Sequence, residues 1–402
     1  MTLANERSVL VVNVGSSTLK FGLFSVAEGG ARLLHGVLEY DGPAGGQLRI
    51  FDSQGREVDS RQLAASRDSA AGELLRYLKS HSLFDSVQAV GHRLVHGGPK
   101  LRQPVLVDSA VRASLDDAIP LAPDHLPTEL HAIDEVSRLA PTLPQVACFD
   151  TGFHKTMPLV ARLFGLPRTL SDSGVMRYGF HGLSYEYVSD TLRRRGELPS
   201  RIIVAHLGSG ASIAALLDGA SIDTSMGLTP TGGITMSTRS GDIDPGVLLY
   251  LLRSRGFSAA DIDEVINRRG GLLGISESSS DVRQLLAASS TDPKAEDAIS
   301  VFCYQAKKFI GAYSAALGGL EALVFTGGVG WRSAEVRARI CENLEFLGIE
   351  IDPTLNGGNA PTISSTRSKV PVRILKTDEE AMIARHVRKV LSQSNVRPSA
   401  IA

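Results

Sequence analysis

The feature that most constrains this fold is a pattern of apolar strand, polar turn and apolar strand that occurs twice. The first copy begins with the run SVLVVNV (residues 8–14), passes through the polar stretch GSSTLK, and continues as a second apolar segment at residues 19–26. The second copy is RIIVAHLGSGASIAALLDG, residues 201–219. Short apolar runs on either side of a glycine-containing turn are typical of β-hairpins. The first turn carries more polar residues than a tight turn needs, which indicates a ligand there.

The two copies align with a constant offset. When Gly15 is placed on Gly208, Asn13 falls on His206, and the offset is 193 residues in a chain of 402. An offset of about half the chain predicts an internal duplication, with two similar domains that each open with a phosphate-gripping hairpin. The alternative is coincidence, because glycine and serine are common in hairpin turns.

The composition excludes several classes of protein. Hydrophobic residues make up 43% and charged residues 21%, as in ordinary soluble globular proteins. The formal net charge of −1 and the aromatic content of 5% argue against nucleic acid or an anionic membrane surface as a partner. The three cysteines lack CxxC or metal-ligand spacing, and we find no apolar signal segment. We therefore expect a cytoplasmic protein with reduced thiols.

Helical spacing predicts helices at about residues 68–82, 108–119 and 128–139, and a largely helical region at 255–295. A third glycine-rich turn is expected in LVFTGGVG (residues 323–330), between an apolar strand and a helix with Ser333 as its N-cap. Strand, turn and helix N-terminus in this order form a natural site for an anion or nucleotide. An ordinary connection between a strand and a helix is the alternative.

Several stretches combine arginine, histidine, aspartate and glycine. They are GHRLVHGG (91–98), FDTGFHK (149–155), RYGFHG (177–182), STRSGDIDP (237–245), SSSDVR (278–283) and KTDEEA (376–381). Phosphoryl transfer requires such groups, because arginine binds anionic oxygens, carboxylates hold divalent metals, and backbone amides bind phosphates. The chain has no GxxxxGK[ST] motif and no protein-kinase motif set, so neither of those classes applies.

Each of these residues also has a simpler explanation by itself. Arg93 can form a surface ion pair, and His181 can be a buried, hydrogen-bonded histidine. Asp150 and Asp242 can shape turns, and Glu379 can begin a helix, where acidic residues are favoured. The combination, rather than any single member, favours a phosphoryl-transfer site.

Taken together, the motifs resemble the acetate and propionate kinase family over about residues 8–388. The matching runs, in order, are NVGSSTLKF, HRLVHGG, FDTGFH, RYGFHG, HLGSGAS, DTSMG, TRSGDIDP, GLLGIS, SSD, FTGGVG and TDEEAMIAR. The resemblance implies an α/β fold of two duplicated actin-like (ribonuclease H-like) domains with a cleft between them that closes on ATP. We expect one domain at residues 1–150 plus 382–402 and a nucleotide-binding domain at residues 151–381.

The resemblance further implies an activity and residue roles. The activity is reversible transfer of phosphate from ATP to acetate, giving acetyl phosphate and ADP, with Mg²⁺ (or Mn²⁺) as cofactor and a homodimer as the assembly. The implied catalytic residues are Asp150, Arg93, Arg239, His181 and His125. The implied substrate pocket contains Val95, Phe180, Pro230 and Asp124. The implied metal site contains Asn13 and Glu379. The implied nucleotide site contains Lys20, His206, Leu207, Gly208, Ser209, Gly210, Asp281, Val282, Arg283, Gly328, Val329, Gly330, Trp331 and Arg332.

Chemistry refines the role of Asp150. A carboxylic acid substrate is already ionised at pH 7, so its attack on phosphorus needs no general base. We therefore interpret Asp150 as a metal or alignment group rather than a proton acceptor. The transfer is expected to be direct and in line.

The sequence departs from the family pattern at a few positions. Asp124 replaces a leucine of the acyl pocket, Ser209 replaces an asparagine, Trp331-Arg332 replaces Glu-Asn, and Tyr185 replaces a histidine. These changes leave open another short-chain or more polar acid, or another phosphoryl donor such as pyrophosphate. A non-catalytic nucleotide-binding regulator is the remaining alternative.

Overall fold

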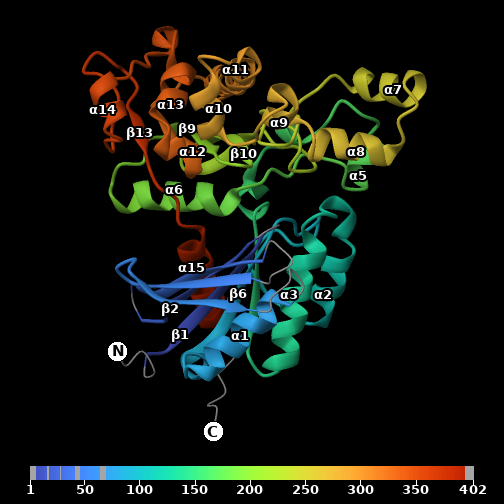
Figure 1. Cartoon of the computed structure of the whole chain (residues 1–402), viewed down its shortest axis with the longest axis vertical. Coiled ribbons are helices and arrows are strands. Elements are labelled where there is room, and N and C mark those ends of the chain that lie inside the picture. The colour runs from blue at the N-terminus through green and yellow to red at the C-terminus, as the bar shows by residue number, and fades with distance from the viewer. Residues whose placement is uncertain (1–5, 16–17, 28, 41–45, 64–68, 394–402) are drawn as a thin grey trace. The chain divides into compact units, whose positions relative to one another are not determined.

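The computed structural model describes residues 6–15, 18–27, 29–40, 46–63 and 69–393. Ser16 and Ser17, which belong to the first polar turn, lie outside the described residues. The chain divides into two compact units, Met1–Gly152 with Asp378–Ala402, and Phe153–Thr377 (Figure 1). These boundaries lie within four residues of the expected domain limits at 150/151 and 381/382.

The first unit is built on an eight-stranded sheet with the strand order β5-β4-β3-β2-β1-β6-β8-β7. Its strands are β1 (Ser8–Val14), β2 (Thr18–Ser25), β3 (Arg32–Glu39), β4 (Gly46–Asp52), β5 (Glu57–Leu63), β6 (Val87–Leu94), β7 (Val105–Leu106) and β8 (Gln145–Phe149). Its helices are α1 (Ala70–Ser80), η2 (Phe84–Ser86), α2 (Ser109–Asp116), η3 (Ile119–Leu121), α3 (Leu126–Leu139) and α15 (Glu379–Gln393). The predicted helices at 68–82, 108–119 and 128–139 are therefore confirmed.

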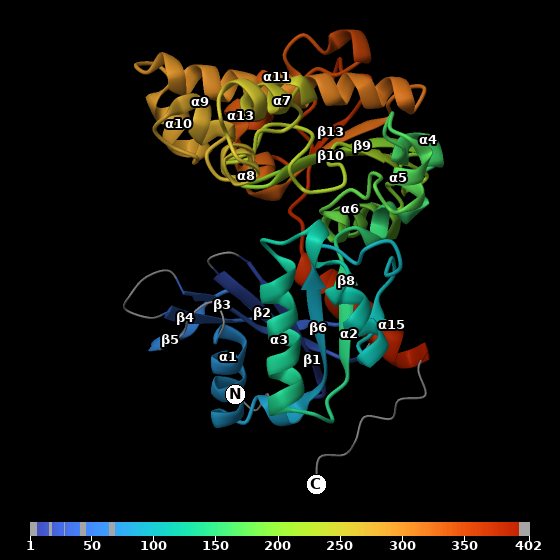
Figure 2. The ribbon, with the colours of Figure 1, turned by 90° about the vertical axis from the view of Figure 1, so that its right-hand side faces the viewer.

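Helices cover both faces of the sheet around β1, so every residue of β1 is buried, whereas β5 at the edge is mostly exposed. Leu10 and Val12 of β1 belong to a core cluster with residues of α1 and α3. Side chains alternate along a strand, so Val9 and Val11 point to the other face. That face is covered by α15, which lies on the side of the sheet opposite to α1 and α3 (Figure 2).

The second unit contains a five-stranded sheet with the order β11-β10-β9-β12-β13. Its strands are β9 (Arg201–Leu207), β10 (Ala211–Leu217), β11 (Ala220–Thr224), β12 (Ala322–Thr326) and β13 (Val372–Ile374). Its helices are η4 (Gly152–Thr156, which begins at the unit boundary), α4 (Leu159–Arg162), α5 (Arg168–Asp172), α6 (Gly182–Arg194), α7 (Pro245–Ser254), α8 (Ala259–Asn267), α9 (Gly271–Ser276), α10 (Val282–Ala288), α11 (Pro293–Ala316), α12 (Gly327–Arg332), α13 (Ala334–Cys341), η5 (Glu345–Leu347) and α14 (Pro353–Gly357).

The two sheets share one topology, as the internal repeat predicts. In each, three antiparallel strands (β3-β2-β1 and β11-β10-β9) are followed by two strands parallel to the first hairpin strand (β6-β8 and β12-β13). The hairpin turns differ in length by one residue, because Val14 pairs with Leu19 whereas Leu207 pairs with Ala211, but Val14 and Leu207 are each the last residue of the first hairpin strand. This places Asn13 and His206 at equivalent positions.

Helices α6 and α15 occupy equivalent places in the two units. α6 follows the chain's exit from the first unit and packs on β9, and its Tyr185 and Val188 share a core with Ile202 and Val204. α15 follows the chain's exit from the second unit and packs on β1 and β6. In both units the polar end of the first strand lies on the face that this helix covers.

The structure differs from the predicted glycine-rich turn at residues 323–330, because helix α12 begins directly after β12. Only Gly327 makes the turn, with a φ of +76°, and the following residues are already helical in α12. A Cβ on Gly327 would lie 2.5 Å from the carbonyl oxygen of Leu207 in the adjacent strand, so only glycine allows this approach. Ser333 caps the next helix, α13, as predicted, since its side chain accepts a hydrogen bond from the amide of Val336.

Candidate active site

An arginine near the end of β6 is the centre of a polar cluster in the first unit. Gly91 and Arg93 lie on the same face of the sheet because they are two residues apart. Gly91 allows α15 to approach this face, since a Cβ there would lie 2.6 Å from Val387 and 2.7 Å from Ile383. Because α15 begins at Glu379, its first residue lies at the edge where β6 ends.

The neighbouring strands bring two more polar side chains to the same edge. Cys148 of β8 pairs with Arg93, so Asp150, two residues later, continues on the same face just past the end of the strand. Asn13, near the end of β1, pairs across the hairpin with Lys20, which is exposed. The parallel strands β1, β6 and β8 therefore place their carboxyl ends, and these polar groups, side by side.

The contacts within this cluster are direct. Arg93 donates through Nε to Asp150 Oδ1 at 3.1 Å and through Nη2 to Asp150 Oδ2 at 2.5 Å. Its third nitrogen, Nη1, donates to Asn13 Oδ1 at 3.2 Å. The carboxylate of Glu379 lies 3.9 Å from Arg93 Nε. The structure thus brings Asn13, Arg93, Asp150 and Glu379 together, and it places none of them as an isolated surface group.

Burial dominates the electrostatics of this cluster. Burial raises the pKa of Glu379 to about 7; the positive charge of Arg93 opposes the rise, and the negative charges of Asp150 and Glu380 add to it. Burial also disfavours the charge of Arg93, but Asp150 and then Glu379 outweigh this and raise its pKa above the ordinary value for arginine. A cation bound beside Glu379 would favour its ionised form.

Residues after β6 are held by a buried carboxylate that the sequence motifs did not identify. The amide of Val95 donates to Glu129 Oε2 at 2.9 Å, and Glu129 is a buried residue in the first turn of α3. His125 is the N-cap residue of α3, and Asp124, just before it, is exposed. An acidic residue on the apolar face of the predicted helix was the only signal that could have identified Glu129.

The second unit carries a polar cluster at the equivalent strand end. His181 stacks on His206, with ring centroids 4.2 Å apart and an interplanar angle of 19°. His181 Nδ1 lies 2.8 Å from Ser212 Oγ, and His206 Nδ1 lies 2.8 Å from Ser184 Oγ. His181 also has a left-handed backbone conformation with a φ of +59°, which is uncommon for a residue other than glycine and is often found at functional sites.

Arg239 and the turn after β9 lie next to His181. A Cβ on Gly210 would lie 3.3 Å from His181 Nε2 and 3.6 Å from Arg239 Nη1. Arg239 Nη1 also donates to the carbonyl oxygen of Pro230 at 3.2 Å. Phe180 is buried, and its carbonyl oxygen lies 3.0 Å from His154 Nε2. The predicted residues Pro230, His181, Gly210 and Arg239 are therefore neighbours.

A pocket of about 580 Å³ in the second unit contains many of the predicted nucleotide-binding residues. The predicted residues that line it are Gly208, Ser209, Asp281, Val282, Arg283, Gly328, Val329 and Arg332. Its remaining lining residues were not predicted: Ser237, Ser280, Leu286 and Ser333. Two of these lie inside the quoted motifs, and Leu286 follows Val282 by one helical turn of α10, so helical periodicity could have identified it.

Other predicted nucleotide residues do not line this pocket. The side chain of Leu207 is buried in the sheet, and Gly330 is buried in α12, where its carbonyl oxygen accepts a hydrogen bond from Arg337 Nη1 at 3.0 Å. The indole of Trp331 contacts two cations, Arg332 at 4.9 Å and Lys376 at 5.7 Å from the ring centroid. Lys20 belongs to the first unit, and its predicted nucleotide role stays a prediction.

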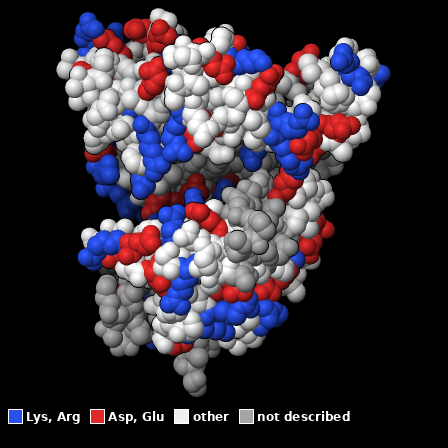
Figure 3. Space-filling model, viewed as in Figure 1, with Lys and Arg blue, Asp and Glu red and all other residues white. Residues whose placement is uncertain are grey.

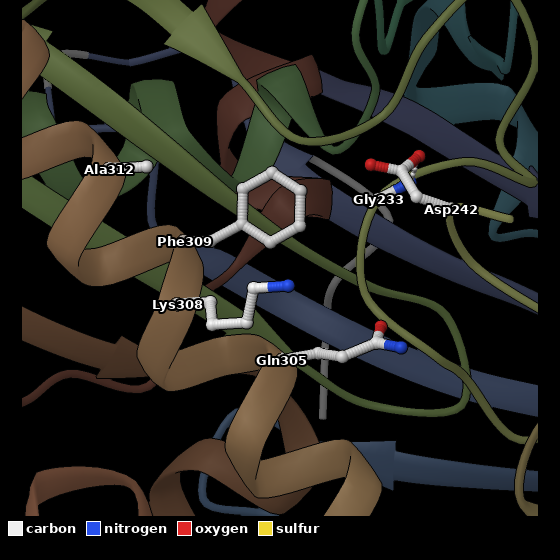
Figure 4. Close-up of a pocket in the computed structure, with 6 residues that line it drawn as sticks. All are labelled: Gly233, Asp242, Gln305, Lys308, Phe309 and Ala312. Atoms are coloured by element: carbon white, nitrogen blue, oxygen red, sulfur yellow. Dashed lines mark hydrogen bonds between the residues drawn. The ribbon is translucent and has the colours of Figure 1, made fainter. Parts of the chain in front are cut away.

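A second, smaller pocket of about 200 Å³ in this unit has a different lining. Figure 4 shows Gln305, Lys308 and Phe309 reaching from α11 toward the loop that carries Gly233 and Asp242. Asp242 Oδ1 accepts a hydrogen bond from the amide of Gly233 at 2.7 Å. This carboxylate therefore shapes its own loop, as the simpler explanation for Asp242 predicts.

The donor atoms in the first unit fit a hard divalent cation. The amide oxygen of Asn13 and the carboxylates of Asp150 and Glu379 are oxygen ligands of the kind that Mg²⁺ prefers. Within the described part of the chain, no group of three or more His, Cys, Asp or Glu side chains is arranged to hold a metal.

Charges of both signs are interspersed over the face of the molecule seen in Figure 3, in keeping with the formal net charge of −1. Among the described residues, no helix is long and apolar enough to be a membrane-span candidate.

Comparison with known proteins agrees with these features. Residues 8–385 match the model of the acetokinase family. The chain is 44% identical to the acetate kinase of Nitrobacter hamburgensis over 97% of this chain and 98% of that protein. The structure is similar to a propionate kinase from Francisella tularensis (TM-score 0.88, 35% identity, 94% and 98% of the two chains). It is also similar to Porphyromonas gingivalis acetate kinase (TM-score 0.85, 40% identity, 96% and 100%). The α/β fold with duplicated actin-like units is thus confirmed, and the chain belongs to the acetokinase family.

Proposed function

We propose that this protein catalyses reversible transfer of the γ-phosphoryl group of ATP to the carboxylate of acetate, giving acetyl phosphate and ADP. The observation that carries the proposal is the match to the acetokinase family over residues 8–385. The polar clusters at the two equivalent strand ends support it, because they contain the arginines, histidines and oxygen ligands that phosphoryl transfer requires.

The reaction balances without a protein base. A carboxylate oxygen of acetate forms a bond to the γ-phosphorus, the bond from phosphorus to the β,γ-bridging oxygen breaks, and ADP leaves with that electron pair. Acetate is ionised at neutral pH, so no proton is removed from the nucleophile. Asp150, whose two oxygens both accept from Arg93, aligns the guanidinium rather than accepting a proton.

Arginines and histidines carry the proposed charge stabilisation. Arg93 and Arg239 bind the substrate carboxylate and the transferring phosphoryl group, because a planar guanidinium fork matches anionic oxygens. His181 and His125 donate to oxygens of the phosphoryl group as charge shifts during the transfer. A small apolar surface from Val95, Phe180 and Pro230 would accept the methyl group, and these roles remain predictions.

Asn13 and Glu379, with Asp150 nearby, would hold the metal, which we propose to be Mg²⁺. When bound, it would neutralise charge on the β- and γ-phosphate oxygens. The large pocket lined by Ser209, Asp281 and Val329 would hold the nucleotide.

We also propose that the protein is a homodimer in the cytoplasm. Helix α7, at the upper right of Figure 1, has no buried residue, although its sequence is PGVLLYLLRS. Val247, Leu249, Tyr250 and Leu252 are between 41% and 55% exposed, which favours an apolar contact with a second copy. Three buried free cysteines support a reducing compartment. Light scattering on a size-exclusion column tests the dimer, and a monomer at micromolar concentration would contradict it.

Trapping of the acyl phosphate as its hydroxamate tests the reaction. We expect product with acetate in the presence of ATP and Mg²⁺, and the panel should include propionate, butyrate and a hydroxylated acid because Asp124 departs from the family pattern. Pyrophosphate in place of ATP, at saturating acetate, tests the donor. Absence of product from both acetate and propionate would refute the substrate assignment, and faster turnover with pyrophosphate would refute the donor.

A further inference from the structure

A buried chain of hydroxyl groups ends on one nitrogen of His181. Tyr185, in the first turn of α6, is fully buried, and its hydroxyl forms a short hydrogen bond with Ser212 Oγ. Ser212, on β10, is also fully buried, and its Oγ lies 2.8 Å from His181 Nδ1. The two contacts arise because Ser212 pairs with His206 across the hairpin and so lies on the sheet face covered by α6.

The direction of these hydrogen bonds follows from counting donors. Ser212 Oγ is the one hydrogen-bond partner of the Tyr185 hydroxyl within the described part of the chain, so Tyr185 must donate to it or leave a buried proton unsatisfied. Burial raises the pKa of Tyr185 above its ordinary value, so the phenol keeps its proton at all physiological pH values. Ser212 then has its own proton to donate, and His181 Nδ1 is the acceptor within reach.

We infer that Tyr185 is a positioning residue that acts through Ser212 to keep the proton of neutral His181 on Nε2. That edge of the ring faces the turn after β9 and Arg239, since a Cβ on Gly210 would lie 3.3 Å from Nε2 and 3.6 Å from Arg239 Nη1. The relay therefore presents an N–H donor, rather than a lone pair, beside a guanidinium. An anionic oxygen at this place would receive hydrogen bonds from both groups.

The relay depends on a position at which this chain departs from the family pattern. In the family pattern a histidine stands at position 185, and either ring nitrogen of a histidine can carry the proton. A phenol has one donor, so its proton fixes the direction of the relay. Only the consequence for catalysis rests on the proposed function; the tautomer of His181 does not depend on it.

Nitrogen NMR measures the tautomer directly. The protein is labelled with ¹⁵N-histidine, long-range ¹H–¹⁵N correlations are recorded at pH 8, and the His181 signals are assigned by their loss in His181→Gln. We expect the shift pattern of the Nε2–H tautomer in the wild type and a mixture of tautomers in Tyr185→Phe and in Ser212→Ala. An Nδ1–H pattern in the wild type overturns the inference, whether or not the protein makes acetyl phosphate.

Kinetics provide the second readout. Tyr185→Phe and Ser212→Ala should each lower kcat roughly 3- to 10-fold, the loss expected for one neutral hydrogen bond, with the KM values for acetate and ATP little changed. The double variant should be no slower than Ser212→Ala, because both changes break one relay. Ser212→Thr, which keeps the hydroxyl, should retain wild-type kcat and tautomer.

Tyr77→Phe is the matched control, because this tyrosine donates to Asp59 at 2.7 Å in the first unit and has no link to His181. It should leave kcat and the His181 signals unchanged. Additive losses in the double variant, or wild-type His181 signals in both single variants, would overturn the relay. If Tyr185→Phe does not fold, the pair Ser212→Ala and Ser212→Thr decides the question alone.

Discussion

Replacing Arg93 by lysine keeps the positive charge but removes the guanidinium fork. The three nitrogens of Arg93 now bind two oxygens of Asp150, at 3.1 and 2.5 Å, and the amide oxygen of Asn13, at 3.2 Å. A lysine ammonium is a single compact donor on a flexible stem. It can replace one bond to Asp150, but it cannot bridge Asp150 and Asn13 in the same geometry.

The size of the effect follows from the bonds that are lost. A hydrogen bond to a charged group contributes about 1.5–3 kcal/mol, and one between a charged donor and the neutral amide falls near the lower end of this range. Losing one bond to Asp150 and the bond to Asn13, with partial recovery by the ammonium, costs about 2–4 kcal/mol. If this alignment is needed in the transition state, kcat/KM for acetate falls about 30- to 900-fold, at about 1.36 kcal/mol per factor of ten.

Initial rates of hydroxamate formation, with acetate varied at saturating ATP, provide the assay for Arg93→Lys. Arg112→Lys is the matched control, because Arg112 makes the same fork to Asp134, at 3.0 and 2.9 Å, on the surface of the same unit. The control should stay within about twofold of the wild type, as expected for a surface pair. A kcat/KM of Arg93→Lys within threefold of the wild type, in a protein that unfolds at the normal temperature, would refute the alignment role.

Three further predictions concern other parts of the molecule. Arg239→Ala should lower kcat/KM on the order of 10²–10³-fold, and near-normal rates would remove this arginine from the mechanism. Burial lowers the pKa of His92 to about 4, so the folded protein binds fewer protons than the unfolded chain between pH 4 and 6.5. Stability should therefore fall as the pH falls through this window, by up to about 3 kcal/mol. His92→Gln, measured by urea unfolding at pH 7 and 4.5, should reduce that loss; an unchanged loss contradicts the assignment. Arg337 is fully buried and donates to Gly330 and to two asparagines, so Arg337→Met should lower the free energy of unfolding by about 3–5 kcal/mol. A melting temperature within 2 °C of the wild type, about the shift that 1 kcal/mol gives, would contradict this.

Local sequence patterns determined much of the fold. Strand periodicity and glycine-containing turns identified both hairpins, and the offset between Gly15 and Gly208 predicted a duplication that the matching strand orders confirm. Helical spacing placed α1, α2 and α3 within a few residues. These predictions succeed because hydrogen bonding and side-chain direction within one element depend on residues that are close in the sequence. The prediction of a glycine-rich turn within residues 323–330 was wrong in part. The chain turns at Gly327, which packs closely on Leu207, and the residues after it are already helical in α12.

The sequence motifs identified most of the candidate residues. The contacts between these residues, however, depend on strand register and helix packing. Arg93 meets Glu379 because Gly91 admits α15 to the same face, and neither residue's neighbours in the sequence reveal this. Glu129 was not predicted as a site residue, because its hydrogen-bond partner, the amide of Val95, lies in a distant part of the sequence.

The sequence by itself therefore determined the two hairpins, their duplication and the chemical character of their polar ends. Only the tertiary structure decided which groups touch, because contacts between distant segments depend on the register of whole strands and on which face a helix covers. The tautomer inferred for His181 is the clearest case. It depends on Tyr185 and Ser212, whose hydroxyls meet only because β10 and α6 pack against each other.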